Sequence, residues 1–350
     1  MKKISRRKAI KSIGAGLLGL AGIAGLWTRE GIRVEARSHL GNGMKGRDEM
    51  EKKVFFNNNQ IKMAGILFLP DDFNEAKKYP ALVISAPAGA VKEQSPSLYG
   101  KKMAQKGFLA LAFDTSHQGE SGGEPRYLEN PTERVEDIRC AVDYLTTLPY
   151  VDIERIGALG ICSGGGYVVN AAMTERRIKA VAGVSLSDPG SWIRDGLDGK
   201  TPVEEQIKLL ESVGKQRTAE ANGAKPVYGP YVPDVVTEDM PVVLKEANNY
   251  YRTPRAQHPN SENRVLMTSL DKLIAFSTFT LTESLLTQPL LLVAGSKADT
   301  IGYSEKLYER VKCKKEMFKI EGATHVDLYD IPKYVDQAIN KLDGFFAKNL

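Results

Sequence analysis

A cysteine flanked by glycines is the clearest candidate for chemistry in this sequence. The motif GICSG (160–164) follows an apolar run typical of a buried strand and precedes a helical pattern. A strand, a tight turn and a helix in this order expose the residue at the centre of the turn as a nucleophile. The turn is strained, so the residues two positions before and after the centre must be small. Cys162 has glycine at both places, whereas Ser163 would have Ile161 at one of them, and we therefore predict Cys162 as the nucleophile.

A thiol nucleophile needs a base, and the base needs an acid that orients it. After such a turn the acid and then the base follow in chain order, each in a loop behind a later strand. Asp299 follows the run PLLLVAG and His325 follows EMFKI, which predicts Asp299 as the acid and His325 as the base. His325 would take the proton of the thiol, and Asp299 would fix the imidazole tautomer. Asp327 is a minor alternative for the acid, and His258 precedes Asp299 and is the weaker choice for the base.

The oxyanion of a tetrahedral intermediate needs two N–H donors. The backbone N–H of Ser163, at the start of the predicted helix, is one candidate. The other should come from the loop after ALVISA, where Pro87 has no N–H. We predict Ala88 as the first choice for this donor and Gly89 as the second.

These residues need a sheet that brings the ends of several strands together. Short apolar runs predict strands at 54–56, 61–70, 81–87, 108–114, 155–161, 178–186, 289–295 and 316–320, and helical spacing predicts helices at 97–107, 133–147, 164–175, 303–312 and 333–347. Repeated β-α-β units predict an α/β fold with a mainly parallel sheet and helices on both faces.

The alternation of strands and helices stops between residues 187 and 286, which are rich in charges, Asn and Pro. A segment of this length is too long for a plain loop, and helical patches occur within it. We predict an inserted, largely helical cap at 187–286. The core would then consist of two parts, 37–186 and 287–350.

The N-terminus has the layout of an export signal. Residues 2–11 (KKISRRKAIK) are basic, 13–27 are apolar and Gly-rich, and the pair Arg6-Arg7 resembles a twin-arginine signal. We predict that residues 1–36 direct export to the bacterial periplasm or the extracellular space. The apolar run is shorter than the ~20 residues that cross a bilayer, so no membrane partner is expected after export.

Composition excludes several other classes of protein. The 350 residues are 42% hydrophobic, which is sufficient for a large core. Eight of the 48 basic and two of the 43 acidic residues lie in 1–36, so the net charge of +5 becomes about −1 for 37–350 and does not predict nucleic-acid binding. Three Cys and four His form neither a disulfide framework nor a metal motif, and we predict no cofactor and no metal.

Together these motifs resemble the α/β-hydrolase superfamily, in particular its dienelactone-hydrolase-like branch. The segments APAGAVKEQ (86–94), FDTSHQGESGGEPRYLENP (113–131) and GATHVDLYD (322–330) are similar to bacterial hydrolases that are related to fungal polyketide transferases. The resemblance covers about residues 50–350 and implies an α/β-hydrolase fold with acyl chemistry at Cys162. Two features depart from the pattern: the cap is larger than in simple dienelactone hydrolases, and Ala86 stands where relatives often have His.

We therefore predict a hydrolase that cleaves an ester, lactone or thioester of a small molecule through an acyl-Cys162 intermediate and a Cys-His-Asp triad. An acyltransferase or a peptidase-like hydrolase would use the same triad, and a non-catalytic binding protein could retain the fold. The sequence assigns no role to His117, His258, Arg126 or Glu93, and it leaves the oligomeric state open.

Overall fold

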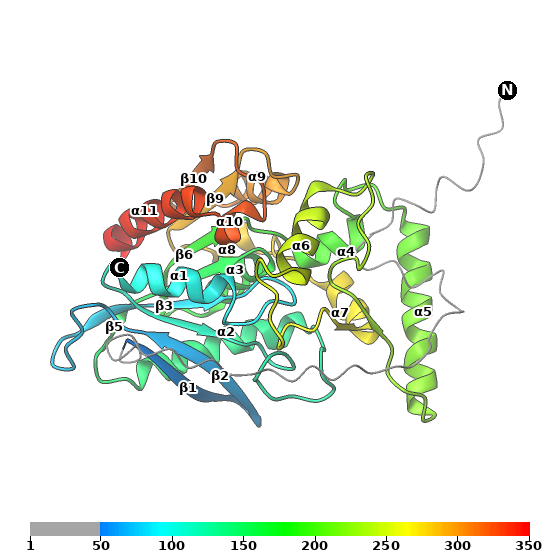
Figure 1. Ribbon diagram of the computed structural model, residues 1–350, viewed down its shortest axis with the longest axis horizontal. Helices are drawn as coiled ribbons and strands as arrows, with labels where there is room; N and C mark the ends of the chain where they lie inside the picture. Colours follow the sequence, from blue (N-terminus) through cyan, green and yellow to red (C-terminus); the bar gives the residue numbers. More distant parts are fainter. Residues whose placement is uncertain (1–49) are drawn as a thin grey trace.

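The computed structural model describes residues 50–350, so the predicted export signal lies outside the described residues. Eight strands form one sheet in the order β1-β2-β4-β3-β5-β6-β9-β10 (Figure 1). β1 and β2 are antiparallel to each other, and β2 is antiparallel to β4. The other strands of this sheet, β4, β3, β5, β6, β9 and β10, are parallel to one another. The strands are β1 (Glu51–Asn58), β2 (Ile61–Phe68), β3 (Tyr79–Ser85), β4 (Leu109–Phe113), β5 (Val151–Ile161), β6 (Ile178–Val184), β9 (Leu290–Gly295) and β10 (Lys315–Ile320).

The central strands β3, β4, β6 and β9 are almost continuously apolar and are buried on both faces of the sheet. In β3, Ala81 and Val83 pack into one hydrophobic cluster, and Leu82 and Ile84 pack into the cluster on the opposite face. The first cluster is completed by α2 (Pro131–Thr146), α3 (Ser163–Thr174) and α9 (Ile301–Arg310). The second is completed by α1 (Ser95–Ala104), α10 (Asp327–Asp330) and α11 (Pro332–Asn349). The predicted α/β fold, with helices on both faces of a mainly parallel sheet, is confirmed.

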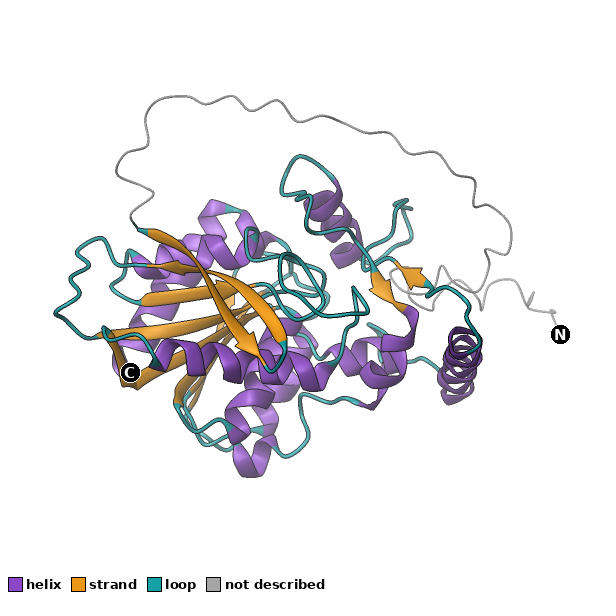
Figure 2. Ribbon diagram, turned by 90° about the horizontal axis from the view of Figure 1, so that it is seen from below, coloured by secondary structure: helices purple, strands orange, loops and turns teal. Residues whose placement is uncertain are grey.

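An insertion connects β6 to β9, which are neighbours in the sheet. Residues 185–289 hold α4 (Pro189–Asp195), α5 (Val203–Ala221), α6 (Val242–Arg252), α7 (Leu270–Ala275) and α8 (Thr282–Leu285), with a short hairpin of β7 (Tyr228–Gly229) and β8 (Val265–Leu266). Helices α4 to α7 gather at one end of the sheet, and α5 lies at the outer edge of the molecule (Figures 1 and 2). We refer to this largely helical insertion as the cap.

The parallel strands end on the side where the loops of the predicted site lie. The loop 86–90 follows β3, Cys162 follows β5, and Ser187 follows β6. Thr300 lies in the segment that follows β9, and His325 lies in the segment that follows β10. Five segments far apart in the sequence therefore meet at one edge of the sheet. Across the described residues 50–350, the helices all fall short of the length and apolarity that a bilayer span requires.

Candidate active site

The turn between β5 and α3 forces Cys162 into a strained conformation. Its φ is 56° and its ψ is −124°, outside the regions that residues with a side chain ordinarily occupy. A Cβ atom on Gly160 would lie 2.2 Å from the carbonyl oxygen of Gly164, and one on Gly164 would lie 2.3 Å from that of Ser85. Both positions next to the turn therefore require glycine, which is the condition that singled out Cys162 over Ser163 in the sequence.

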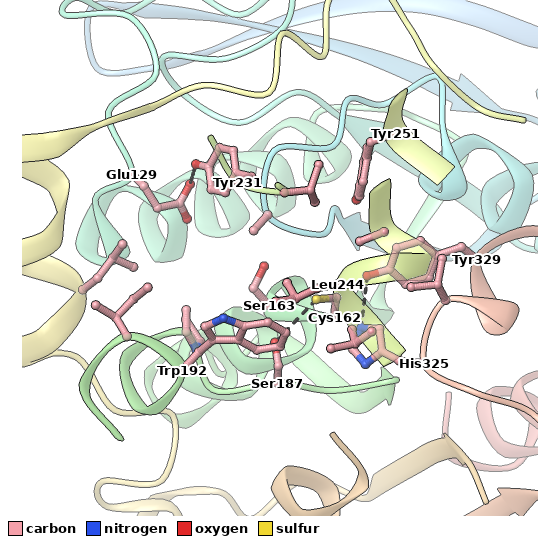
Figure 3. A pocket seen from close by; sticks show the side chains of 18 residues that line it. Glu129, Cys162, Ser163, Ser187, Trp192, Tyr231, Leu244, Tyr251, His325 and Tyr329 are labelled. Carbon is pink, nitrogen blue, oxygen red and sulfur yellow. Dashed lines mark hydrogen bonds between the residues drawn. The ribbon is translucent and has the colours of Figure 1, made fainter. Parts of the chain in front are cut away.

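The surroundings of Cys162 favour its thiolate. Burial by itself would raise the pKa of the thiol. The charge of His325 and hydrogen bonds from His325, Tyr329 and Ser187 outweigh burial and lower the pKa of Cys162 to about 6. The Ser187 hydroxyl lies 3.5 Å from the sulfur (Figure 3). A thiol with this pKa is ionised at neutral pH, and the resulting thiolate is the nucleophilic form of cysteine.

His325 is held through both ring nitrogens. Its Nδ1 lies 2.5 Å from Oγ1 of Thr300, and its Nε2 lies 3.1 Å from the hydroxyl of Tyr329 (Figure 3). Its carbonyl oxygen accepts a hydrogen bond from the Ser185 hydroxyl, at 2.9 Å. With the proton on Nδ1, the ring donates to Thr300 and presents Nε2 as an acceptor for the proton of Cys162.

The surroundings of Asp299 differ from the prediction. We expected its carboxylate on His325, but the side chain is exposed and its Oδ2 accepts a hydrogen bond from the N–H of Val243, at 3.0 Å. Val243 lies in the first turn of α6, where free N–H groups and the positive end of the helix attract a carboxylate. Thr300, the next residue, is buried and contacts Nδ1 of His325 instead. The alternative Asp327 also has a local role, because it accepts from the N–H of Thr324.

The loop after β3 reaches the same site. Ala88 lines one pocket together with Cys162 and Ser163. Gly89 has a φ of 71°, and a Cβ atom at this position would lie 2.6 Å from the ring of Tyr231. Its carbonyl oxygen accepts from the hydroxyl of Ser261, in the cap. Of the two residues predicted for the second donor, Ala88 lines the Cys162 pocket and Gly89 does not.

The Cys162 pocket lies between the edge of the sheet and the cap (Figure 3). Helices α4, α6 and α7 supply most of its apolar wall. The apolar side chains are Pro189, Trp192, Ile193, Val232, Val243, Leu244, Ala247, Leu273 and Val326. Hydroxyl groups and one carboxylate complete the lining: Ser163, Ser187, Tyr231, Tyr251, Tyr329 and Glu129. In the described part of the chain, neither Lys nor Arg lines this pocket.

Glu129 is a buried carboxylate that contacts four other side chains. Oε1 accepts from the hydroxyl of Tyr167 at 2.7 Å and forms an ion pair with Arg134, whose Nε lies 3.2 Å away. Oε2 accepts from the hydroxyl of Tyr231 at 2.9 Å and from Nε2 of Gln118 at 3.1 Å. Three hydrogen bonds and one ion pair therefore tie Glu129 to the wall of the pocket.

A cluster of three carboxylates lies where the loops that follow β3 and β4 meet. Carboxylate oxygens of Glu93, Asp114 and Glu120 are close enough together to surround a cation. The ammonium of Lys92 fills this position, at 2.6, 2.8 and 2.6 Å from the three carboxylates. Hydrogen bonds from Lys53 and from Lys92 lower the pKa of Glu120 to about 2. The group is an ion-pair cluster around the buried ammonium of Lys92 that fixes the loop after β3, and this accounts for Glu93.

The residues left without a role in the sequence lie away from the Cys162 pocket. His117 bonds through Nδ1 to the carbonyl oxygen of Pro125 and through Nε2 to Glu133, both at 3.0 Å. Arg126 donates to two carbonyl oxygens of the same loop. His258 accepts from the N–H of Asn260 within the cap. All three therefore stabilise loops.

Sequence reasoning missed three residues that contact the reactive groups. Ser187 follows β6, Thr300 follows the predicted acid directly, and Tyr329 lies four residues after His325. Tyr329 lies in α10, which begins two residues after His325, so closeness in the sequence was the one signal for this residue. Ser187 and Thr300 carried no signal beyond their position behind a strand.

Comparison with known proteins identifies the family of the chain. Residues 93–331 match the family described as Serine aminopeptidase, S33. YcjY, an uncharacterized protein of Escherichia coli K12, is 42% identical over 305 residues, which cover 86% of this chain and 100% of YcjY. The crystal structure of the hypothetical protein PA2218 from Pseudomonas aeruginosa has a TM-score of 0.82 at 34% identity and covers 90% of this chain and 100% of that one. The crystal structure of the α/β hydrolase GrgF from Penicillium has a TM-score of 0.73 at 20% identity, with 85% and 98% covered.

The chain is an enzyme of the α/β-hydrolase type. Three features define this class: the order of the strands, the strained turn after β5 and the histidine in the loop that follows the last strand. Within this superfamily, the chain belongs to the Serine aminopeptidase, S33 family. The resemblance to α/β-hydrolases that the sequence motifs indicated is therefore confirmed. A cysteine occupies the position at which the family name implies a serine.

Proposed function

We propose that the enzyme cleaves or transfers the acyl group of an ester, lactone or thioester through a thioester at Cys162. The observation that carries the proposal is the strained turn, which presents Cys162 beside His325 with a lowered pKa. Nε2 of His325 takes the thiol proton, and the thiolate attacks the carbonyl carbon of the substrate. The negative charge moves to the carbonyl oxygen, where the N–H groups of Ser163 and Ala88 stabilise it.

The intermediate then collapses. The carbon–oxygen or carbon–sulfur bond of the leaving group breaks, and His325 returns its proton to the leaving group. Water attacks the acyl-Cys162 thioester in a hydrolase, and another nucleophile attacks it in a transferase. In this scheme Oγ1 of Thr300 accepts a hydrogen bond from Nδ1–H of His325, which keeps its Nδ1 proton. The role of acid that the sequence predicts for Asp299 stays a prediction.

The pocket favours acyl groups over peptides with a free amino end. An aminopeptidase must bind the α-ammonium of its substrate, and Glu129 is the carboxylate that lines the Cys162 pocket. Both oxygens of Glu129 already have two partners. A substrate ammonium would have to displace one of them, so we propose an ester, lactone or thioester rather than a peptide. GrgF is named as a polyketide transferase, which keeps transfer to another acceptor within the proposal.

Mass spectrometry tests the covalent step. The wild type, Cys162→Ala and Ser163→Ala are exposed briefly to p-nitrophenyl acetate, and the intact mass and the peptides are analysed. We expect an acetyl group on the peptide that contains Cys162 in the wild type and in Ser163→Ala, and no acetyl group in Cys162→Ala. An adduct that survives Cys162→Ala but disappears in Ser163→Ala would make this a serine esterase. Added amines, alcohols or thiols then show whether an acceptor competes with water.

We also propose the cellular compartment in which the enzyme acts. The twin-arginine-like signal at 1–36 would carry the folded enzyme to the periplasm or out of the cell. Cell fractionation of the Arg6→Lys/Arg7→Lys variant should show retention in the cytoplasm, and unchanged secretion of this variant would contradict export by this route.

A further inference from the structure

Two hydroxyl groups of the Cys162 pocket have no hydrogen-bond partner. Oγ of Ser163 and Oη of Tyr251 are buried, with side chains 2% and 7% exposed, and neither oxygen is paired with another described residue. Both residues line the pocket, and both hydroxyls point into it in Figure 3. Buried hydroxyl groups are nearly always paired in folded proteins, so an unpaired group in a pocket calls for a partner outside the chain.

The two hydroxyls come from opposite walls of the pocket. Ser163 begins α3 in the core, directly after the nucleophile, and Tyr251 lies near the end of α6 in the cap. The walls around them are mainly apolar, and the carboxylate of Glu129 already contacts four protein side chains. An unsubstituted hydrocarbon chain would cover both hydroxyls and leave them unpaired, which costs free energy. An oxygen atom on that chain would pair with them.

We infer that Ser163 and Tyr251 bind an oxygen substituent of the acyl chain, so that the site selects hydroxyacyl or ketoacyl groups over unsubstituted acyl groups. The inference rests on the proposed function, because it places the acyl chain in the Cys162 pocket. A hydroxyl group can donate to a keto oxygen and can exchange donor and acceptor roles with a hydroxyl substituent. The absence of Lys and Arg from the described lining excludes a carboxylate or phosphate as the substituent, because its charge would be buried without a partner.

Tyr251 has a second polar neighbour that the test must separate from a substrate. Burial raises the pKa of Tyr251, and its interaction with the hydroxyl of Tyr329 acts to lower it, although the two hydroxyls do not reach hydrogen-bond geometry. Tyr329 in turn contacts His325. If Tyr251 acted through Tyr329, its loss would change the ionisation of Cys162 and leave the choice of acyl group unchanged.

Thermal unfolding gives the first readout. Tyr251→Phe removes one oxygen that has no partner and keeps the ring, so the Tm should stay the same or rise. Tyr231→Phe is the matched control in the same pocket, since its hydroxyl donates to Glu129 at 2.9 Å. This variant should have a lower Tm than the wild type. A clear fall in Tm for Tyr251→Phe would show that its hydroxyl has a structural partner and would overturn the inference.

Binding of uncharged, unreactive analogues gives the decisive readout. In the Cys162→Ala background, calorimetry compares hexanamide with 2-, 3- and 4-hydroxyhexanamide. We expect the best hydroxyamide to bind about fivefold or more tightly than hexanamide. Replacing Tyr251 with Phe in this background should reduce the preference severalfold, and adding Ser163→Ala should abolish it.

The outcomes separate this inference from the proposed function. Equal binding of hexanamide and all three hydroxyamides would overturn the inference even if Cys162 forms an acyl-enzyme. A preference that depends on Tyr251, without an adduct on Cys162 in the wild type, would support it and would overturn the covalent mechanism. A binding preference that survives Tyr251→Phe in the Cys162→Ala background would overturn the role of Tyr251 in binding. If the single variant Tyr251→Phe, which keeps Cys162, also shows a shifted pH dependence of Cys162 alkylation, Tyr251 is a positioning residue for Tyr329.

Discussion

Replacing His325 with Gln should move the titration of Cys162 from about pH 6 to above the ordinary range of a thiol. In the wild type, the charge of His325 and the hydrogen bonds from His325, Tyr329 and Ser187 lower the pKa of Cys162 against the effect of burial. Glutamine removes the positive charge and leaves the burial in place, so the neutral thiol becomes the favoured form.

The rate of reaction alone would be a poor measure of this change. A thiol of pKa about 6 is roughly 90% ionised at pH 7, whereas an ordinary thiol is ionised to only about 1–3%. The lower basicity also weakens the nucleophile, because a decrease of about three pKa units reduces thiolate reactivity roughly 20-fold. The two effects nearly cancel, and the wild type would react only a few times faster at pH 7. The pH at which alkylation is half-maximal is therefore the informative quantity.

Alkylation by iodoacetamide between pH 4 and pH 10, followed by peptide mass spectrometry, measures this midpoint. Cys140 and Cys313 serve as references in the same sample, because burial raises the pKa of Cys313, and that of Cys140 to about 11. Tyr329→Phe should give a smaller upward shift of the Cys162 midpoint than His325→Gln, since it removes a hydrogen bond and no charge. If Cys162 of the wild type titrates near pH 8 or above, or together with Cys140, the thiolate–imidazolium pair does not exist.

Four further substitutions test the positions of single groups. Thr300→Val should lower kcat on a p-nitrophenyl ester by about tenfold to a hundredfold through loss of the Nδ1 contact of His325, and Asp299→Asn should lower it less; the reverse order in the same assay would restore Asp299 as the acid. Gly164→Ala should lower the free energy of unfolding in urea by about 3 kcal/mol or more, because its Cβ would lie 2.3 Å from a carbonyl oxygen, and a shift below about 0.5 kcal/mol would contradict the tight turn. Glu129→Gln should cost about 3–5 kcal/mol by leaving a buried guanidinium unpaired, and an unchanged urea midpoint would show that this ion pair adds no stability.

The strands of the core and the nucleophile turn could be predicted from the sequence because each depends on local residues. Parallel strands that are buried on both faces must be continuously apolar, and the runs at 81–87 and 289–295 are of this kind. The turn at Cys162 leaves no room for side chains at Gly160 and Gly164. Both patterns are therefore visible in the residue types alone.

The partners of His325 could not be predicted in the same way. Asp299 and Thr300 are consecutive, and both could reach an imidazole behind the next strand. The choice between them depends on α6, whose first turn offers the N–H of Val243 to a carboxylate. α6 belongs to the cap, a segment without the regular alternation that located the strands. The docking of a helix more than 50 residues earlier in the chain therefore decides which neighbour faces the histidine.

The cap helix that carries Tyr251 is attached at both ends next to the partners of His325. At the start of α6, Asp299 accepts from the N–H of Val243 at 3.0 Å. Three residues beyond its end, Arg255 makes a bidentate ion pair with Asp330, at 2.5 and 2.8 Å.

Asp299 precedes Thr300, which contacts Nδ1 of the histidine, and Asp330 follows Tyr329, which contacts Nε2. Each residue that binds the cap is therefore the direct chain neighbour of a residue that contacts His325. A displacement of α6 would therefore pull on both nitrogen contacts of His325 and on Tyr251 at once. The cap is attached next to the contacts of His325 and also supplies a wall of the Cys162 pocket, so a change in the cap that weakens binding should also change the ionisation of Cys162.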